Sequence, residues 1–292
     1  MMPYLVLAGA QLAVGAAAIF ARYALSGASP LAVAASRLDV AAIVLIVIAA
    51  VRRSSPPSVS MRQATFLAGA GVALAVHFGT WIGSLEYTSV AISTLLVATT
   101  PLWTALYDAV FLRRPLTLQA AAAFVTGGAG AAAIVGFNRT MPPVPGHTLL
   151  GACLALAGSL AIAAYFIAVR EVRRELSTRT IVTHTYAWAG AALSLGAVIA
   201  HQAPPAASDT IAWGGILAMA LVSQLLGHTA LNASLRWFTP SAVSFSTLVE
   251  PVIAAVLALL VFGERIAPVA IVGGAIVLLS IAVVLHEEPT TI

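Results

Sequence analysis

The sequence has very little charge and almost no cysteine. Only 8% of its 292 residues are charged, whereas soluble domains carry about 25%, so a soluble fold is excluded. All 14 basic residues are arginines that occur singly or in pairs, and no basic face forms that could follow a phosphate backbone, so nucleic-acid binding is not supported. The single cysteine, Cys153, excludes an internal disulfide and a cysteine-based metal site.

Catalytic motifs are absent as well. The chain contains no HExxH, GxSxG, P-loop or aspartate-rich diphosphate motif, and no Ser/His/Asp set at a convincing spacing. We therefore predict that the protein is not an enzyme and has no catalytic residues, no cofactor and no metal site. Without a nucleotide site, transport driven by ATP hydrolysis in this chain alone is also excluded.

Long apolar runs dominate what is present. Hydrophobic residues make up 61% of the chain and the mean hydropathy is +1.01. A membrane helix needs about 20 apolar residues, and the first run has no basic segment before it, so we interpret it as a retained helix. We predict an all-α membrane protein with ten transmembrane helices near residues 4–24, 31–51, 63–85, 89–111, 118–137, 147–169, 179–200, 210–234, 241–262 and 268–286.

The arginines predict how these spans are oriented. If the N-terminus is cytoplasmic, ten arginines lie in cytoplasmic loops and three lie in loops on the other side, while Arg37 is inside a span. Positively charged loops favour the cytoplasm. Both termini are therefore predicted to be cytoplasmic.

The second half of the chain repeats the first at an offset near 150. The segment 99–101 aligns with 249–251, and each segment ends in a proline. Five spans per copy, over residues 1–140 and 141–292, make the second copy enter the membrane in the opposite sense. Inverted repeats are a construction principle of secondary transporters, although a duplicated bundle without transport activity is the alternative.

The ends of both copies resemble the EamA domain of the drug/metabolite transporter superfamily. The second copy has Val249-Glu250-Pro251-Val252 followed by Gly263-Glu264-Arg265-Ile266, and the first copy matches at Thr100-Pro101-Leu102 but has Arg113-Arg114-Pro115 at the turn. The resemblance implies a secondary transporter of small organic solutes. Within the superfamily, the length, the ten spans and the aromatic and histidine content resemble bacterial amino-acid exporters of the YddG type.

This resemblance implies a function, a location and partners. We expect export of amino acids, aromatic ones included, across the bacterial inner membrane by alternating access. The alternative is a proton-coupled exporter of another metabolite or drug. The expected partners are amino acids or similar small molecules and the lipid bilayer, and the protein is either a monomer or a homodimer.

Ionisable residues within spans are expensive and need a reason. Arg37 and Asp39 are two residues apart, so they point in different directions, and we expect each to bond to a neighbouring helix or a re-entrant backbone. Glu250 directly precedes Pro251, which removes a backbone hydrogen bond. Its carboxylate either binds a substrate amine or a proton, or is a neutral acid fixed to a neighbouring helix.

Two stripes of polar and aromatic residues lie on equivalent spans. In the eighth span Gln224, His228 and Asn232 are spaced by four, and in the third span His77 and Trp81 are too. Residues with this spacing share one helix face. We predict that both stripes line one substrate cavity, although a lone histidine is more often a packed core residue, and this alternative stays open for each of the two.

Aromatic and polar residues on other spans complete the predicted site. Aromatic walls with a few hydrogen-bonding groups suit a partly apolar solute of medium size. The prolines interrupt the helical hydrogen bonds at matching places in both copies, which predicts hinges. The further binding candidates are Gln11, Thr100, Trp103 and Tyr165 beside Glu250, and the predicted hinges are Pro101 and Pro251.

Glycines gather on the fifth and the tenth span. These are Gly127, Gly128 and Gly130 in one and Gly273 and Gly274 in the other. Small residues allow membrane helices to approach closely. They predict a scaffold contact between the two spans or a dimer contact.

Overall fold

The computed structural model describes residues 2–52, 59–111, 113, 118–137, 147–234, 237 and 246–287. Regular secondary structure within these ranges is entirely helical, as predicted. Helices satisfy their backbone hydrogen bonds internally, which the hydrocarbon core of a membrane requires. The helices of the first half are α1 (Met2–Gly15), α2 (Ala17–Ala24), α3 (Pro30–Val51), α4 (Met61–Tyr87), α5 (Val90–Val97), α6 (Thr100–Phe111) and α7 (Leu118–Phe137).

The second half repeats this order with more interruptions. Its eighth predicted span consists of two α-helical pieces with a π-helix between them, and in its ninth a 3₁₀ turn directly precedes the long α-helical piece. The helices are α8 (Thr148–Arg170), α9 (Thr178–Ile199), α10 (Thr210–Ala218), η1 (Met219–His228), α11 (Thr229–Ser234), η2 (Thr247–Val249), α13 (Glu250–Phe262) and α14 (Pro268–Glu287).

Short polar side chains determine where several helices begin. Ser60 and Gln63 form a capping box at the start of α4, in which each side chain bonds to the other residue's backbone N–H. Ser177 and Asp209 each accept a backbone hydrogen bond at the start of α9 and α10. Gly263 ends α13 with a φ of 66°, a conformation that glycine adopts without steric cost.

The predicted count of ten spans is supported in part. Within the described residues, six helical segments are long and apolar enough to cross a membrane, and two further apolar helices, Thr247–Phe262 and Pro268–Ser280, are shorter. Helix α9 has 22 residues but opens with polar Thr178, Arg179 and Thr180. It remains a predicted span, as does α7, and residues 241–245 of the predicted ninth span lie outside the described residues.

The six qualifying segments agree with the predicted boundaries to within a few residues. The first of them differs from the prediction in one respect, because a turn at Ala16 divides it into α1 and α2. The segments are Met2–Ala24, Pro30–Val51, Met61–Tyr87, Val90–Phe111, Thr148–Arg170 and Thr210–Ser234.

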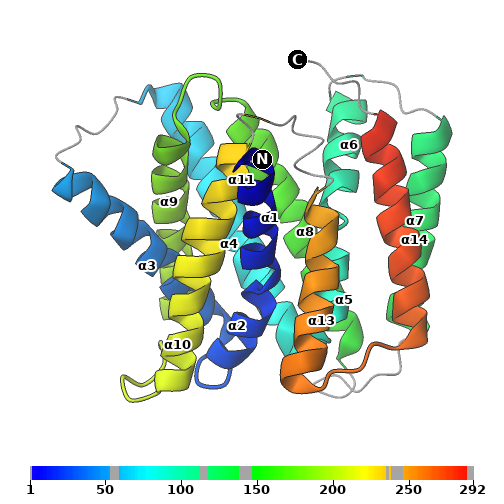
Figure 1. Ribbon diagram of the computed structural model, residues 1–292. Coiled ribbons are helices and arrows are strands. Elements are labelled where there is room, and N and C mark those ends of the chain that lie inside the picture. Colours follow the sequence, from blue (N-terminus) through cyan, green and yellow to red (C-terminus); the bar gives the residue numbers. More distant parts are fainter. Residues whose placement is uncertain are drawn as a thin grey trace.

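The packing of the helices keeps its pattern when the two halves are exchanged. Helix α4 packs on α8, and the equivalent helices of the opposite halves pack together too, α1 on η1 and α2 on α10. Equivalent helices also pair directly, α3 with α9 and α7 with α14. Figure 1 shows α1 beginning and α14 ending at the upper end of the bundle. This packing is the one expected for two repeated halves, and the inverted sense of the repeat stays a prediction.

The contact between α7 and α14 agrees with the predicted role of the glycines as a scaffold contact. A Cβ atom at Gly130 would lie 2.9 Å from the Gly273 carbonyl oxygen, and one at Gly127 would lie 3.1 Å from Ser280 Cβ. The hydroxyls of Thr126 and Ser280 also lie 2.9 Å apart across this contact. The two helices stand beside each other at the edge of the bundle in Figure 1.

Both predicted hinge prolines lie at helix interruptions. Ala98 and Thr99 separate α5 from α6, and Pro101 is the second residue of α6. Pro251 is likewise the second residue of α13, directly after the 3₁₀ turn η2. Proline is tolerated in the first helical turn but breaks a helix interior, which explains why each proline follows an interruption. Whether these points bend during transport remains a prediction.

Candidate functional site

A buried arginine lies inside the bundle where α3, α4 and η1 meet. Arg37 has no exposed surface, and its Nη2 donates a 2.7 Å hydrogen bond to Oε1 of Gln224. The Arg37 Cζ atom lies 3.9 Å from the ring centroid of Phe78 and 5.8 Å from that of Trp81. One amide and two aromatic rings therefore hold the guanidinium.

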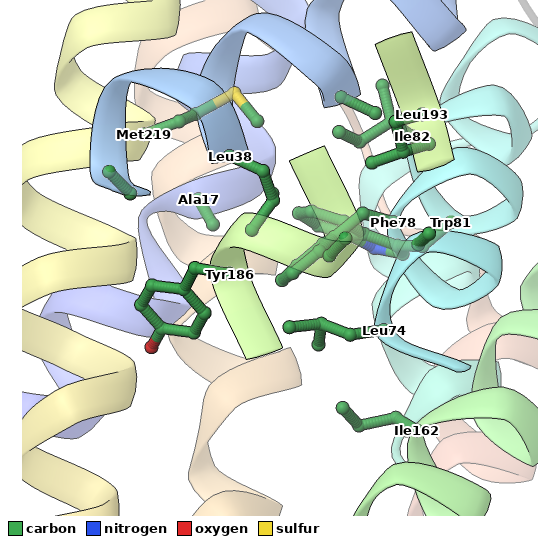
Figure 2. Packing of buried hydrophobic residues seen from close by; sticks show 14 of the residues in the cluster. Ala17, Leu38, Leu74, Phe78, Trp81, Ile82, Ile162, Tyr186, Leu193 and Met219 are labelled. Carbon is green, nitrogen blue, oxygen red and sulfur yellow. The ribbon is translucent and has the colours of Figure 1, made fainter. Parts of the chain in front are cut away.

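The surroundings of these rings are apolar. Phe78 and Trp81 belong to the larger hydrophobic core cluster together with Leu38, Leu74 and Ile82. Figure 2 shows these side chains converging from different helices, with Tyr186 of α9 in the same cluster. A cation placed here is removed from water and from lipid headgroups.

His77 is fixed by the backbone of α8. Its Nδ1 lies 2.8 Å from the Gly158 carbonyl oxygen, and because a carbonyl only accepts, Nδ1 carries the proton. The His77 ring is parallel to that of Trp81, with centroids 6.2 Å apart. The two residues thus lie on one side of α4, as their spacing predicts, while their binding role remains a prediction.

The π-helix η1 brings two residues of the second stripe to this cluster. Gln224 binds Arg37, and the His228 ring meets Phe78 edge-on, with centroids 5.8 Å apart and planes at 90°. π-Helical segments are rare and occur frequently at functional sites. Equivalent helices of the two halves therefore contribute His77 and Trp81 on one side and Gln224 and His228 on the other.

Asn232, the third member of that stripe, is engaged elsewhere. It lies in α11, one turn beyond η1, and its Nδ2 donates to the His228 carbonyl oxygen at 2.9 Å. Its own carbonyl oxygen accepts a 2.7 Å hydrogen bond from Nη2 of Arg173. The buried Tyr165 faces Asn232 and Thr185. Tyr165 and Asn232 thus form a second group, between the arginine cluster and the Arg173 end of the bundle.

A third group surrounds Ser159 of α8. Trp103 Nε1 donates to the Ser159 hydroxyl at 3.1 Å, and the hydroxyls of Thr100 and Thr99 lie 3.2 and 3.0 Å from the same oxygen. Ser159 follows Gly158, whose carbonyl holds His77. Helix α8 therefore places the predicted residues Thr100 and Trp103 next to the arginine cluster.

The remaining predicted binding residues, Gln11 and Glu250, lie on α1 and α13, two helices that pack against each other. Gln11 is buried and its Nε2 donates a 2.7 Å hydrogen bond to the Ser246 hydroxyl. Among the described residues, none forms an ion pair or hydrogen bond with the Glu250 carboxylate. Both alternatives for Glu250, a binding role and a contact with a neighbouring helix, therefore stay predictions.

The sequence matches a known family over almost its full length. Residues 1–136 and 149–286 each match the profile of the EamA-like transporter family. The chain belongs to this family. It is accordingly a multi-pass membrane transporter with a two-repeat architecture, and family membership agrees with the prediction that it is not an enzyme.

A solved structure shows that this EamA-like transporter shares its fold with another protein. The structure, titled "Crystal structure of protein", has 17% sequence identity and a TM-score of 0.67, and the match covers 97% of this chain and 96% of that one. At this identity the likeness concerns the fold alone. No curated protein matches the chain.

Several residues of the transporter's clusters, Phe78, Ser159, Tyr186 and Arg37 among them, were not predicted site residues. Phe78, Ser159 and Tyr186 gave no signal beyond being aromatic or small within an apolar run. Arg37 did give one, because an ionisable residue within a span indicates a functional site by default, but its partner helix was not evident. Within the described part of the EamA-like chain, no group of three or more His, Cys, Asp or Glu residues is arranged to hold a metal ion.

Proposed function

We propose that this EamA-like transporter exports amino acids, aromatic ones included, across the bacterial inner membrane by alternating access. One observation carries the proposal: polar and aromatic residues from equivalent helices of the two halves gather around the buried Arg37. Inverted-repeat transporters bind their substrates near the membrane midplane between the repeats. His77, Trp81, Gln224 and His228 come from the two halves in this way.

The chemistry of these side chains suits an amphipathic solute. Phe78 and Trp81 offer aromatic surface, Gln224 and the histidines offer hydrogen bonds, and Thr100 and Trp103 add polar groups around Ser159. Small-molecule sites combine apolar walls with a few polar groups that fix orientation. An aromatic amino acid has both kinds of surface.

The proposed orientation follows from the arginines. Helix α4 begins and helix α8 ends at the upper end of the bundle in Figure 1, where α1 begins and α14 ends. Arg62 lies at this end of α4, and Arg170 and Arg173 lie at or just beyond this end of α8. Positive loops favour the cytoplasm, so this end is proposed to be cytoplasmic. Export then means that substrate enters from the upper end.

Counterflow into liposomes tests the substrate class. Purified protein is reconstituted into vesicles loaded with unlabelled phenylalanine, and uptake of labelled amino acids is measured without ATP. We expect saturable uptake of aromatic amino acids, reduced by Trp81→Ala and retained by Trp188→Ala, since Trp188 is half exposed. If none of the amino acids in a complete panel is taken up, the proposal is contradicted.

The direction of transport is tested in cells. Feeding a phenylalanine-containing dipeptide raises internal phenylalanine after hydrolysis, and expression of the protein should accelerate its efflux. Equal efflux with and without the protein contradicts export.

A second candidate is proton-coupled export of another metabolite or drug. The observation that favours it is the Glu250 carboxylate, which has no polar partner among the described residues and lies at the interruption before Pro251. In that case Glu250→Gln abolishes stimulation of transport by a pH gradient, whereas Glu86→Gln, at the end of α4, does not. A full rate in Glu250→Gln and no response to the gradient favour facilitated diffusion.

A further inference from the structure

We propose that Arg37 binds the carboxylate of the transported solute, so that the substrates of this site are monoanionic or zwitterionic carboxylates. The inference rests on the proposed function, because it specifies which group of an amino acid the site recognises. It is carried by the contacts of the guanidinium, which are incomplete in a way that an anion would complete.

The Arg37 guanidinium has hydrogen-bond donors without an acceptor among the described residues. A guanidinium has five N–H groups on three nitrogens and no acceptor. In Arg37 only Nη2 has an acceptor, Oε1 of Gln224, while buried Nε and Nη1 have none among the described residues. Buried donors are nearly always satisfied in proteins, so two free nitrogens on one side chain mark a place for an absent acceptor.

The positive charge of Arg37 also has no negative partner among the described residues. No carboxylate of the described residues lies within 4.0 Å of the Arg37 guanidinium. Asp39, the acid closest in sequence, instead accepts a 2.7 Å hydrogen bond from Ser194 of α9. A cation inside a membrane protein normally pairs with an anion or a backbone carbonyl. Here the negative charge has to come from a ligand.

Two aromatic rings lie beside the Arg37 guanidinium. Phe78 packs against the guanidinium with its centroid 3.9 Å from Cζ, and Trp81 lies 5.8 Å away. Aromatic faces attract a cation without neutralising it. They leave its N–H groups free for a planar carboxylate, which a guanidinium matches in shape. The rings also supply surface for an apolar side chain of the bound solute.

The ionisable side chains around Arg37 limit the charge of the ligand. Among the described residues, the other ionisable side chains facing Arg37 are His77, His228 and Tyr186, so one permanent cation is available there. Phosphate recognition usually recruits more than one cation or a helix N-terminus. A single guanidinium with an amide beside it fits one carboxylate.

The unmodified protein provides the first test. Thermal stability in detergent and counterflow inhibition are measured with phenylalanine, phenylalaninamide, phenethylamine, phenylacetate and inorganic phosphate, in a buffer free of carboxylates. We expect phenylalanine and phenylacetate to bind at least about tenfold more tightly than the two compounds without a carboxylate. Equal binding of phenethylamine and phenylalanine overturns the proposal, and so does a preference for phosphate.

Variants of Arg37 provide the second test. Arg37→Gln should remove the preference for carboxylates, raising the apparent KM for phenylalanine at least about tenfold, and Arg37→Lys should restore part of it because it keeps the charge but not the planar fork. Asp39→Asn is the matched control on the same helix, since an amide oxygen still accepts from Ser194. An unchanged KM in Arg37→Gln overturns the proposal.

The outcomes of these two tests differ according to whether carboxylate binding by Arg37 or amino-acid export is wrong. If no amino acid is carried but phenylacetate stabilises the native protein and not Arg37→Gln, the carboxylate site stands and only the amino-acid assignment fails. If the Arg37 variants do not fold, the ligand series on the native protein decides alone. If amino acids are transported but compounds with and without a carboxylate bind equally well, the proposed function is supported and carboxylate binding by Arg37 is rejected.

Discussion

Helix α4 carries two phenylalanines that each pack against an arginine, and the two pairs differ in nearly everything else. Arg62 lies over Phe66 near the start of α4, with Cζ 5.3 Å from the ring centroid. Arg37 lies over Phe78 at 3.9 Å inside the bundle. The Arg62 side chain is 54% exposed and Arg37 is fully buried.

The difference lies in what balances the charge. Arg62 pairs with Glu175 at 3.2 Å and with Glu171 at 3.7 Å, and it also contacts solvent. Arg37 has one amide and no acid among the described residues. The same pair of residue types is therefore a surface contact in one place and an unbalanced charge in the other. Only the second calls for a ligand.

The largest expected effect comes from truncating the buried ring. Phe78→Ala removes a fully buried side chain that contacts both Arg37 and His228, and such truncations cost about 3–5 kcal/mol. Phe66→Ala, its partner in the comparison, should cost much less because Phe66 is only partly buried. Melting temperatures of both variants in detergent check this.

Similar melting temperatures for the two variants would contradict that prediction. They would mean that Phe78 is not tightly packed and that the buried cluster is loose. Transport should also be lost in Phe78→Ala and kept in Phe66→Ala, which provides a second readout on the same proteins.

The sequence predicted the fold far better than the partners within it. Apolar runs and their arginine-bearing breaks located the described helices to within a few residues, because the membrane requires about 20 apolar residues per span. Spacing also predicted correctly that His77 lies beside Trp81. What the sequence left open were the interruptions at Ala16 and in η1. Gly15 precedes the first and Gly227 lies within the second, but glycines also occur within the uninterrupted helix α4, so they do not distinguish those positions.

The partners of Arg37 depend on contacts distant in sequence. Gln224 is 187 residues away, and only the packing of α3 against η1 brings the two together. Gln224 and His228 of the predicted stripe contact Arg37 and Phe78. Asn232 lies one turn further along, in α11, where its side chain donates to the carbonyl oxygen of His228, and the binding role of all three residues stays a prediction.

A smaller effect is expected from a glycine that lies between the two phenylalanines. A Cβ atom at Gly71 would overlap Cβ of Trp188 and lie 3.0 Å from the Thr185 carbonyl oxygen, so Gly71→Ala pushes α9 away. Overpacking typically costs about 1–3 kcal/mol. Because Tyr186 follows Thr185 and faces Gln224, transport should fall as well.

Gly69 on the same helix is the matched control. Nothing lies within 4 Å of a Cβ atom at Gly69, and alanine favours the helix over glycine. Gly69→Ala should therefore leave stability unchanged or raise it slightly. A loss in Gly69→Ala equal to that in Gly71→Ala would show that helix propensity, and not the approach of α9, explains the effect.

The smallest effect is expected at the surface pair. Arg62→Ala removes two ion pairs and a ring contact, but surface ion pairs contribute about 0–1 kcal/mol, and the partners Glu175 and Glu171 remain hydrated because their side chains are 48% and 41% exposed. The melting temperature should change little, and less at high salt because salt screens exposed charges. Transport of a carboxylate should keep its KM. A tenfold rise in KM in Arg62→Ala would remove the distinction between the two arginines, because an exposed and acid-paired guanidinium would then matter to the substrate as much as the buried one.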